Sequence, residues 1–244
     1  MSSPALKRAE PARARKLVLF DIDGTILWTD GAGRRAVFGA LEEQFQAVLP
    51  GDHRFDGKTD PQIVRELLRH GGVSDADIDA RLDQVLERYY SLLREELDGA
   101  DHREHVFPGV HALLDELEGR DDVVLGLLTG NIEAGAHAKL TAVGIEPHRF
   151  VVGAFGSDHH DRPELPEIAR RRAERTLGHP IAGHDVVVIG DTPADVACGV
   201  GIGARAIGVA TGRYTVEELE ACDAAAVFAD LSDTDAVVRA ILGD

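Results

Sequence analysis

The stretch LVLFDIDGT, residues 17–25, decides the fold and introduces the chemistry of this chain of 244 residues. Its first four residues are all apolar, which is typical of a strand buried on both faces of a parallel sheet. Asp21, Asp23 and Gly24 follow where such a strand would end. Ligands of open α/β sheets bind outside the carboxyl ends of the strands. The stretch therefore predicts the functional edge of a parallel sheet.

Short apolar runs of the same kind recur along the chain, at 123–128, 150–152, 186–189 and 206–209. Helical patterns separate the later runs, and Pro108, Pro163 and Pro193 stand near the expected helix starts. This alternation predicts an α/β fold with a doubly wound, Rossmann-like parallel sheet.

The interval 30–106 breaks the alternation, because it shows helical periodicity without any strand-like run. One helix is expected to begin at Asp60, and another after Ser74, which resembles a capping box with Asp77. The interval is therefore predicted to be an inserted all-helical domain that acts as a lid. The remaining predicted segments are a flexible tail, residues 1–16, and an α/β core, residues 17–29 and 107–244.

Charge and composition limit the class of partner. Twenty-six basic and 43 acidic residues give a formal charge of −17, which argues against nonspecific binding to nucleic acid or to an anionic membrane. A local cation can still invert the field in a cleft, so an anionic substrate remains possible. Two cysteines are too few for a disulfide framework, and no apolar run approaches the roughly 20 residues of a membrane span. We expect a cytoplasmic protein, monomeric or dimeric.

Polar residues follow each of the other main strands as well. The group that the sheet edge would gather consists of Asp21, Asp23, Thr129, Gly130, Asn131, Arg162, Asp191 and Asp195. Each fragment alone has a plainer explanation, such as a helix cap or a solvated charge. Together they crowd carboxylates that need protons or a cation, and Mg²⁺ prefers such oxygen ligands. A calcium loop does not fit, because Ile26 and Ala32 stand where that loop needs Gly and Glu.

The expected chemistry is phosphoryl transfer. An aspartate beside Mg²⁺, with Asp21 and Asp191 as natural ligands, can attack phosphorus and form an aspartyl-phosphate. Asp23 projects to the same side of an extended chain and could protonate the leaving oxygen, if its surroundings raise its pKa above about 3.9. Thr129 and the amides of Gly130 and Asn131, expected at a helix N-terminus, suit phosphoryl oxygens.

The segments DIDGT (21–25), LLTGN (127–131), Arg162-Pro163 and GDTPAD (190–195) resemble the four ordered motifs of the haloacid dehalogenase superfamily. The helical insertion resembles the C1 cap of its phosphoglycolate-phosphatase-like branch. The resemblance implies a nucleophile and Mg²⁺ ligand at Asp21, and a general acid/base at Asp23 that binds the metal through its backbone carbonyl. It further implies a phosphoryl contact at Thr129, a metal ligand at Asp191 and support of the metal site by Asp195. The third motif of this superfamily usually has a lysine, and Arg162 stands at that position. Its guanidinium is a planar group of N–H donors, unlike the point-like charge of an ammonium.

The resemblance implies a Mg²⁺-dependent phosphatase that acts on a small phosphorylated metabolite such as phosphoglycolate. A phosphomutase similar to beta-phosphoglucomutase is the alternative, and a non-catalytic phospho-accepting regulatory domain is a more distant one. Lys58, in FDGKTD (55–60), is expected to contact substrate, although a helix cap at Thr59 or Asp60 would also explain this segment. His159 and His160 could indicate a metal site by themselves, but beside Arg162 we expect them to be loop residues.

Overall fold

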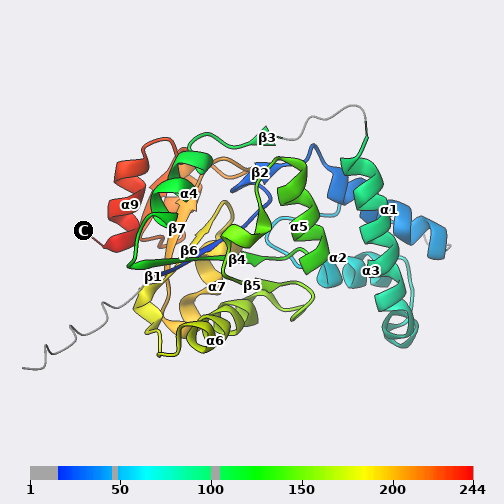
Figure 1. Ribbon diagram of the computed structural model, residues 1–244. Coiled ribbons are helices and arrows are strands. Elements are labelled where there is room, and N and C mark those ends of the chain that lie inside the picture. Colours follow the sequence, from blue (N-terminus) through cyan, green and yellow to red (C-terminus); the bar gives the residue numbers. More distant parts are fainter. Residues whose placement is uncertain (1–15, 46–48, 100–104, 244) are drawn as a thin grey trace, which may run out of the picture.

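The computed structural model describes residues 16–45, 49–99 and 105–243. A six-stranded parallel sheet with the order β5-β4-β1-β6-β7-β8 forms its centre (Figure 1). The strands are β1 Lys16–Phe20, β4 Val123–Thr129, β5 Val152–Phe155, β6 Val186–Gly190, β7 Arg205–Val209 and β8 Ala226–Phe228. Because β1 pairs with β4 on one side and β6 on the other, the strand that precedes Asp21 lies inside the sheet. The predicted fold class is confirmed.

Alternate residues of β1 face opposite sides of the sheet, and helices cover both sides. The helices of the core are α4 Val110–Glu118, α5 Glu133–Ala142, α6 Leu165–Leu177, α7 Pro193–Cys198, α8 Val216–Glu220 and α9 Thr234–Leu242. Val18 and Phe20 pack in one hydrophobic cluster with residues of α4, α5 and α9, whereas Leu17 and Leu19 pack in another with residues of α6 and α7. Burial on both faces explains the unbroken apolar runs.

Three helices interrupt the α/β alternation, as the sequence predicted. They are α1 Ala32–Gln44, α2 Asp60–His70 and α3 Asp75–Leu97, and they form a hydrophobic cluster of their own, which Ile132 of the core joins (Figure 1). Ser74 caps α3, because its hydroxyl accepts a hydrogen bond from the Asp77 N–H at 3.2 Å. Across the described residues, no helix combines the length and the apolar character that crossing a bilayer requires.

Several boundaries differ from the sequence prediction. The strand expected at 150–152 is β5, which spans Val152–Phe155. Phe150 instead follows a short 3₁₀ helix, Pro147–Arg149, and its ring meets Phe20 edge-on with centroids 6.4 Å apart. Val151 is 55% exposed, so apolar character alone misplaced this strand.

Short strands that carry little periodicity escaped prediction. β8 lies at one edge of the sheet and is partly buried. β2 Leu27–Trp28 and β3 His105–Val106 pair antiparallel. Neither was predicted, and β3 lies within 30–106, where no strand was expected. They join the two crossings between the core and the helical insertion. The tail predicted over residues 1–16 lies outside the described residues, except for Lys16, which begins β1.

Candidate active site

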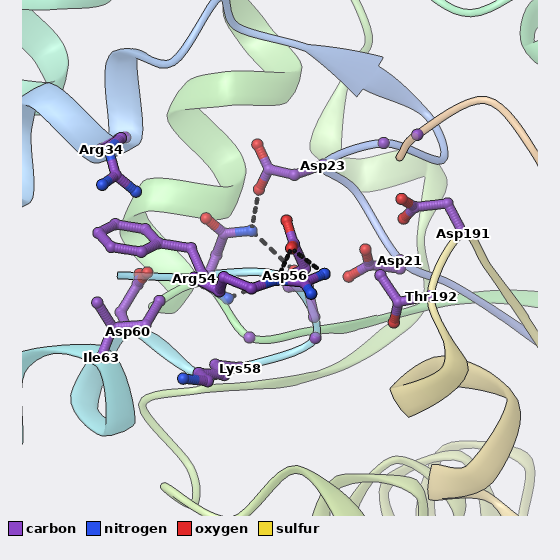
Figure 2. Close-up of a pocket in the computed structure, with 18 of the residues that line it drawn as sticks. Asp21, Asp23, Arg34, Arg54, Asp56, Lys58, Asp60, Ile63, Asp191 and Thr192 are labelled. Carbon is purple, nitrogen blue, oxygen red and sulfur yellow. Dashed lines mark hydrogen bonds and ion pairs between the residues drawn. The ribbon is translucent and has the colours of Figure 1, made fainter. Parts of the chain in front are cut away.

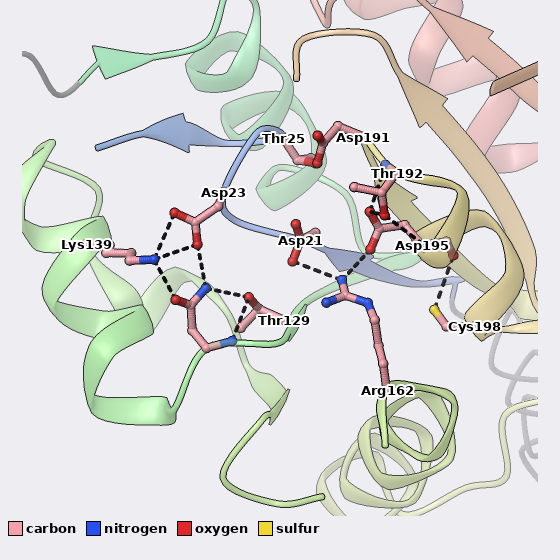
Figure 3. A network of polar contacts seen from close by, with 11 residues as sticks. Asp21, Asp23, Thr25, Thr129, Lys139, Arg162, Asp191, Thr192, Asp195 and Cys198 are labelled. Atoms are coloured by element: carbon pink, nitrogen blue, oxygen red, sulfur yellow. Dashed lines mark hydrogen bonds and ion pairs between the residues drawn. The ribbon is translucent and has the colours of Figure 1, made fainter. Parts of the chain in front are cut away.

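Three carboxylates meet where β1 and β6 end. Asp21 follows β1 and Asp191 follows β6, while Asp195 lies in α7 (Figure 3). All three are buried, and one carboxylate oxygen of each lies within 4.8 Å of the others. The structure thus brings together the acids that the sequence placed at separate strand ends.

Asp195 is held by the start of its own helix. Thr192 caps α7, and its hydroxyl accepts a hydrogen bond from the Asp195 N–H at 3.2 Å. One oxygen of Asp195 accepts hydrogen bonds from the Thr192 N–H at 3.0 Å and from the Thr192 hydroxyl at 2.7 Å. Its other oxygen accepts from Arg162. Both oxygens are therefore occupied, which fits a supporting role better than direct metal ligation.

Arg162 supplies the buried positive charge of this cluster. It begins a 3₁₀ turn, Arg162–Glu164, that leads into α6, so Pro163 lies just before this helix instead of starting it. Its Nη2 donates to Asp21 Oδ1 at 3.1 Å and to Asp195 Oδ1. The Arg162 Nε is buried and finds no acceptor among the described residues. The guanidinium therefore balances two acids, while its buried Nε–H has no partner among the described residues.

Asp23 takes part in a second network, on the other side of Asp21 (Figure 3). Its carboxylate accepts from Lys139 Nζ at 2.8 and 2.7 Å and from Asn131 Nδ2 at 2.7 Å. Lys139 also donates to Asn131 Oδ1 at 2.6 Å, and Asn131 Nδ2 reaches the Thr129 hydroxyl at 2.8 Å. The network links the predicted general acid/base to the predicted phosphoryl-binding residues.

Lys139 was not found by sequence reasoning. Its side chain lies with Ala136 and Leu140 on the buried side of α5, and it is only 4% exposed. A lysine within the apolar stripe of a helix was the available signal, since lysine is almost never fully buried without a partner. The start of α5 was also misplaced: it begins at Glu133, so Gly130 and Asn131 lie in the preceding loop.

Burial and repulsion shift the protonation of the clustered acids. Burial raises the pKa of Asp21 to about 7, with Arg162 opposing the rise and Asp195 adding to it. Burial, with repulsion from Asp195 and Asp21, raises the pKa of Asp191 well above its usual value, although a hydrogen bond from the Thr25 hydroxyl opposes it. Such acids gain from a cation that replaces their protons.

Glycines leave room around the Asp191 carboxylate. A Cβ atom on Gly24 would lie 2.4 Å from Asp191 Oδ2, and one on Gly212 would lie 1.8 Å from the same atom. Only residues without side chains fit these positions, and Gly24 in addition has a φ of +88°. With oxygen atoms as its donors, the cluster fits a hard divalent cation such as Mg²⁺.

A cavity of about 480 Å³ lies over these residues, and the helical insertion forms its other wall (Figure 2). The insertion touches the core closely here. Thr59 donates to the His160 carbonyl at 2.7 Å, and the Asp60 N–H donates to the Gly130 carbonyl at 2.8 Å. Asp60 Oδ2 accepts from the Ile132 N–H at 2.8 Å. The insertion therefore closes over the strand ends.

The predicted substrate contact lies in this wall. Lys58 lines the cavity, but its ammonium group pairs with Glu66 and approaches His53 Nε2 at 3.4 Å. Thr59 caps α2 through a hydrogen bond from the Gln62 N–H at 3.2 Å. The segment thus contains both the helix cap and a cavity-lining lysine that the sequence offered as alternatives.

His159 and His160 lie apart from the clustered acids. Their rings stack on each other with centroids 4.9 Å apart, and neither lines the cavity. The group of described residues that could hold a metal ion consists of Asp21, Asp191 and Asp195, without either histidine. Arg162, two residues after His160, reaches the site instead.

Comparison with known proteins assigns the arrangement to a family. A model of the haloacid dehalogenase-like hydrolases matches residues 15–203, well over half of the chain. The chain belongs to this family. The match includes the segments that carry Asp21, Thr129, Arg162 and Asp191, and it confirms the resemblance drawn from the sequence.

Relatives of this haloacid dehalogenase-like hydrolase cover nearly its whole length. It is 27% identical over 229 residues to "Probable phosphatase IndB" of Dickeya dadantii, an alignment that covers 93% of this chain and 95% of the relative. Its fold is similar to that of a predicted phosphoglycolate phosphatase of Haemophilus somnus, with TM-score 0.67 and 17% identity over 92% and 98% of the two chains. It is also similar to CbbY of Rhodobacter sphaeroides in complex with phosphate, with TM-score 0.70 and 18% identity over 90% and 96%.

Proposed function

We propose that this haloacid dehalogenase-like hydrolase is a Mg²⁺-dependent phosphatase. Its substrate would be a small phosphorylated, phosphoglycolate-like metabolite, and hydrolysis would pass through an aspartyl-phosphate on Asp21. The observation that carries the proposal is the buried Asp21 carboxylate at the sheet edge, with two further carboxylates within 4.8 Å and Arg162 at 3.1 Å. The relative named as a probable phosphatase, aligned over 93% of the chain, supports the same activity.

Asp21 and Asp191 would hold the metal ion, together with the backbone carbonyl of Asp23. Backbone hydrogen bonds close the turn that contains Asp23: the Gly24 N–H donates to the Leu27 carbonyl at 2.9 Å, and the N–H groups of Thr25, Ile26 and Leu27 donate to the Ile22 carbonyl at 2.9 to 3.2 Å. None of them uses the Asp23 carbonyl. When bound, Mg²⁺ would offset the charge of the carboxylates and of the phosphoryl oxygens.

Hydrolysis would then proceed in two displacements at phosphorus. A carboxylate oxygen of Asp21 attacks phosphorus, the bond to the ester oxygen breaks, and Asp23 gives that oxygen a proton. Water next attacks the phosphorus of the aspartyl-phosphate and gives a proton to Asp23. Orthophosphate leaves and the Asp21 carboxylate is restored. The Asp23 side chain is 33% exposed and lines the cavity. It can therefore give a proton to the leaving ester oxygen and receive one from the attacking water.

The surrounding donors would bind and orient the phosphoryl group. Thr129 ends β4 and lies beside Asp21 (Figure 3), and the amides of Gly130 and Asn131 follow it in the loop before α5. Arg162 adds positive charge from the opposite side, where its Nη2 lies 3.1 Å from Asp21 Oδ1. Preorganised donors of this kind stabilise the charge that develops in the transition state.

The helical insertion, residues 30–106, would serve as a cap on a core of residues 17–29 and 107–244. Its contacts through Thr59 and Asp60 cover the strand ends, and closure of this kind excludes water other than the attacking molecule. Lys58 remains a predicted substrate contact in the cap wall.

A phosphate-release assay tests the proposal. We expect turnover over a panel of small phosphomonoesters that requires Mg²⁺, stops with a chelator and is abolished in Asp21→Asn. Asp121→Asn, at an exposed position outside the cavity, is the matched control and should retain full activity.

Other outcomes would reject the proposal. Activity near that of the wild type in Asp21→Asn would exclude Asp21 as the nucleophile. Interconversion of sugar phosphates with little phosphate release would indicate a phosphomutase. A stable phosphoprotein without turnover would indicate a regulatory domain.

A further inference from the structure

The basic residues that line the cavity differ in how their charge is balanced. They are Arg34, Arg54, Lys58, Lys139, Arg162 and Arg213. Five of them have a carboxylate oxygen within 4.0 Å, from Asp56 for Arg54 and Arg213, Glu66 for Lys58, Asp23 for Lys139, and Asp21 and Asp195 for Arg162. Arg34 is the exception within the described part of the chain.

Arg34 is held without being neutralised. Its Nη1 donates to the His53 carbonyl at 2.8 Å, and its Nη2 donates to the Gly51 carbonyl. The guanidinium lies 5.0 Å from the centroid of the Phe38 ring and 4.8 Å from that of Phe55. Carbonyls and ring faces orient a guanidinium but leave its charge in place. A guanidinium carries five N–H donors, so the two carbonyl contacts leave donors for a ligand.

The position of Arg34 separates two ends of the cavity. Figure 2 shows Asp21, Asp191 and Thr192 at one side of the pocket and Arg34 at the other, with Asp23 between them. Phosphoryl transfer would take place at the first end. Arg34, on α1 of the helical insertion, faces the end where the organic part of a substrate would lie.

The acids in the same wall do not cancel this charge. Asp56 is bonded to Arg54 at 3.0 Å, and Asp60 accepts the Ile132 N–H at 2.8 Å. Asp52 lines the cavity as an exposed residue and forms no ion pair with Arg34 in the part of the chain that the structure describes. An uncompensated cation beside apolar rings is suited to an anion that the cavity encloses.

We propose that Arg34 forms a subsite for a second anionic group, a carboxylate or a phosphate, on the organic part of the phosphomonoester. The inference rests on the proposed phosphatase function and names the class of its substrate. It also assigns the distal anion to Arg34 in preference to Lys58, because the Lys58 ammonium is already paired with Glu66.

Binding to an inactive protein tests the subsite directly. In an Asp21→Asn background with Mg²⁺, calorimetry would compare phosphoglycolate, ethylene glycol bisphosphate and ethyl phosphate. Ethyl phosphate matches phosphoglycolate in size but has a neutral end. We expect at least one of the two anionic compounds to bind about tenfold or more tightly than ethyl phosphate, as charge-assisted hydrogen bonds produce. The compound that binds more tightly identifies the distal group.

The same titrations would be repeated after Arg34→Met is added to the Asp21→Asn protein. Methionine keeps an apolar stem against the rings of Phe38 and Phe55. We expect it to remove the preference for anionic compounds and to change ethyl phosphate binding less than about twofold. Arg35→Met is the matched control: Arg35 is the next residue of α1, its Nε pairs with Glu96 at 2.7 Å, and it does not line the cavity. Thermal unfolding would verify the fold, and Arg34→Gln replaces Arg34→Met if the latter fails to fold.

Several results would overturn the subsite. These are equal binding of all three compounds, no effect of Arg34→Met, or an equal loss for ethyl phosphate, which would mean that Arg34 acts only on structure. The failures of the two proposals are distinguishable. Phosphate release from substrates with neutral and anionic ends alike, without dependence on Arg34, rejects the subsite and keeps the phosphatase. Binding that depends on Arg34 without turnover of any ester rejects the phosphatase and keeps the subsite.

Discussion

Replacing Arg162 with methionine should destabilise the metal-free protein in a way that depends on pH. The variant keeps an apolar stem of similar length but removes the cation between Asp21 and Asp195, whose side chains are 9% and 1% exposed. Removing one partner of a buried ion pair costs about 3 to 5 kcal/mol, because the remaining charge is left uncompensated. We therefore expect a loss of about 3 kcal/mol in the free energy of unfolding at about pH 8.

The sign of the pH dependence follows from the pKa of Asp21. Burial raises it from 3.8 to about 7, and Arg162 opposes that rise. A group with a raised pKa contributes stability that is complete below its unfolded pKa and is lost as pH rises through its folded pKa. Without Arg162 the pKa rises further, so stability falls more steeply toward pH 8. At about pH 5 Asp21 is protonated in both proteins and needs no cation.

Urea unfolding followed by circular dichroism, in the presence of a chelator, measures both values. We expect the loss caused by Arg162→Met to be larger at pH 8 than at pH 5 by up to about 1.4 kcal/mol, which corresponds to the one pH unit between the Asp21 pKa of about 7 and pH 8. An equal loss at both pH values would show that Arg162 stabilises the protein by packing alone. That result would refute the electrostatic account of this residue.

Three further predictions concern the metal site and the neighbouring loop. Mg²⁺ should raise the melting temperature more at about pH 8 than at about pH 5.5, because ligands must lose their protons to bind it; an equal rise, against a control of matched ionic strength, would contradict a site built from Asp21 and Asp191. Gly212→Ala should raise the Mg²⁺ concentration for half-maximal activity about tenfold or more, because the new Cβ would lie 1.8 Å from Asp191 Oδ2; Gly201→Ala, with nothing within 4 Å, should not, and similar values for the two variants would argue against the predicted crowding. His159→Ala and His160→Ala should keep activity within about twofold in a phosphate-release assay, and a larger loss would place these histidines in the mechanism.

Parallel topology made much of the site predictable. Buried strands show as unbroken apolar runs, and their carboxyl ends meet at one edge of the sheet. Asp21 and Asp191 could therefore be brought together from sequence alone, because each follows such a run directly. Strand β5 was misplaced because Phe150 and Val151 are apolar but do not belong to it. At the ends of a short strand, the apolar character of a residue is a poor guide to whether the residue belongs to the strand.

Contacts between elements that are distant in the chain could not be predicted in this way. The pairing of Lys139 with Asp23 depends on how α5 is rotated against the sheet, over a separation of 116 residues. The significance of Arg34 appears only when every other cavity cation has been matched with its acid. Lys58 was selected from its sequence context, but its partner Glu66 lies eight residues further along the chain, within α2. Charge balance within a cavity is a property of three-dimensional packing.

Trapping the phosphorylated protein tests the central claim most directly. The protein would be quenched in acid during turnover of a phosphomonoester with Mg²⁺, digested with pepsin at low pH, and analysed by mass spectrometry. We predict that the peptide that contains Asp21 gains the mass of one phosphoryl group, and that this signal disappears in Asp21→Asn and without Mg²⁺. Sustained phosphate release by the wild type with the phosphoryl group on another residue, or an active Asp21→Asn protein, would contradict the account.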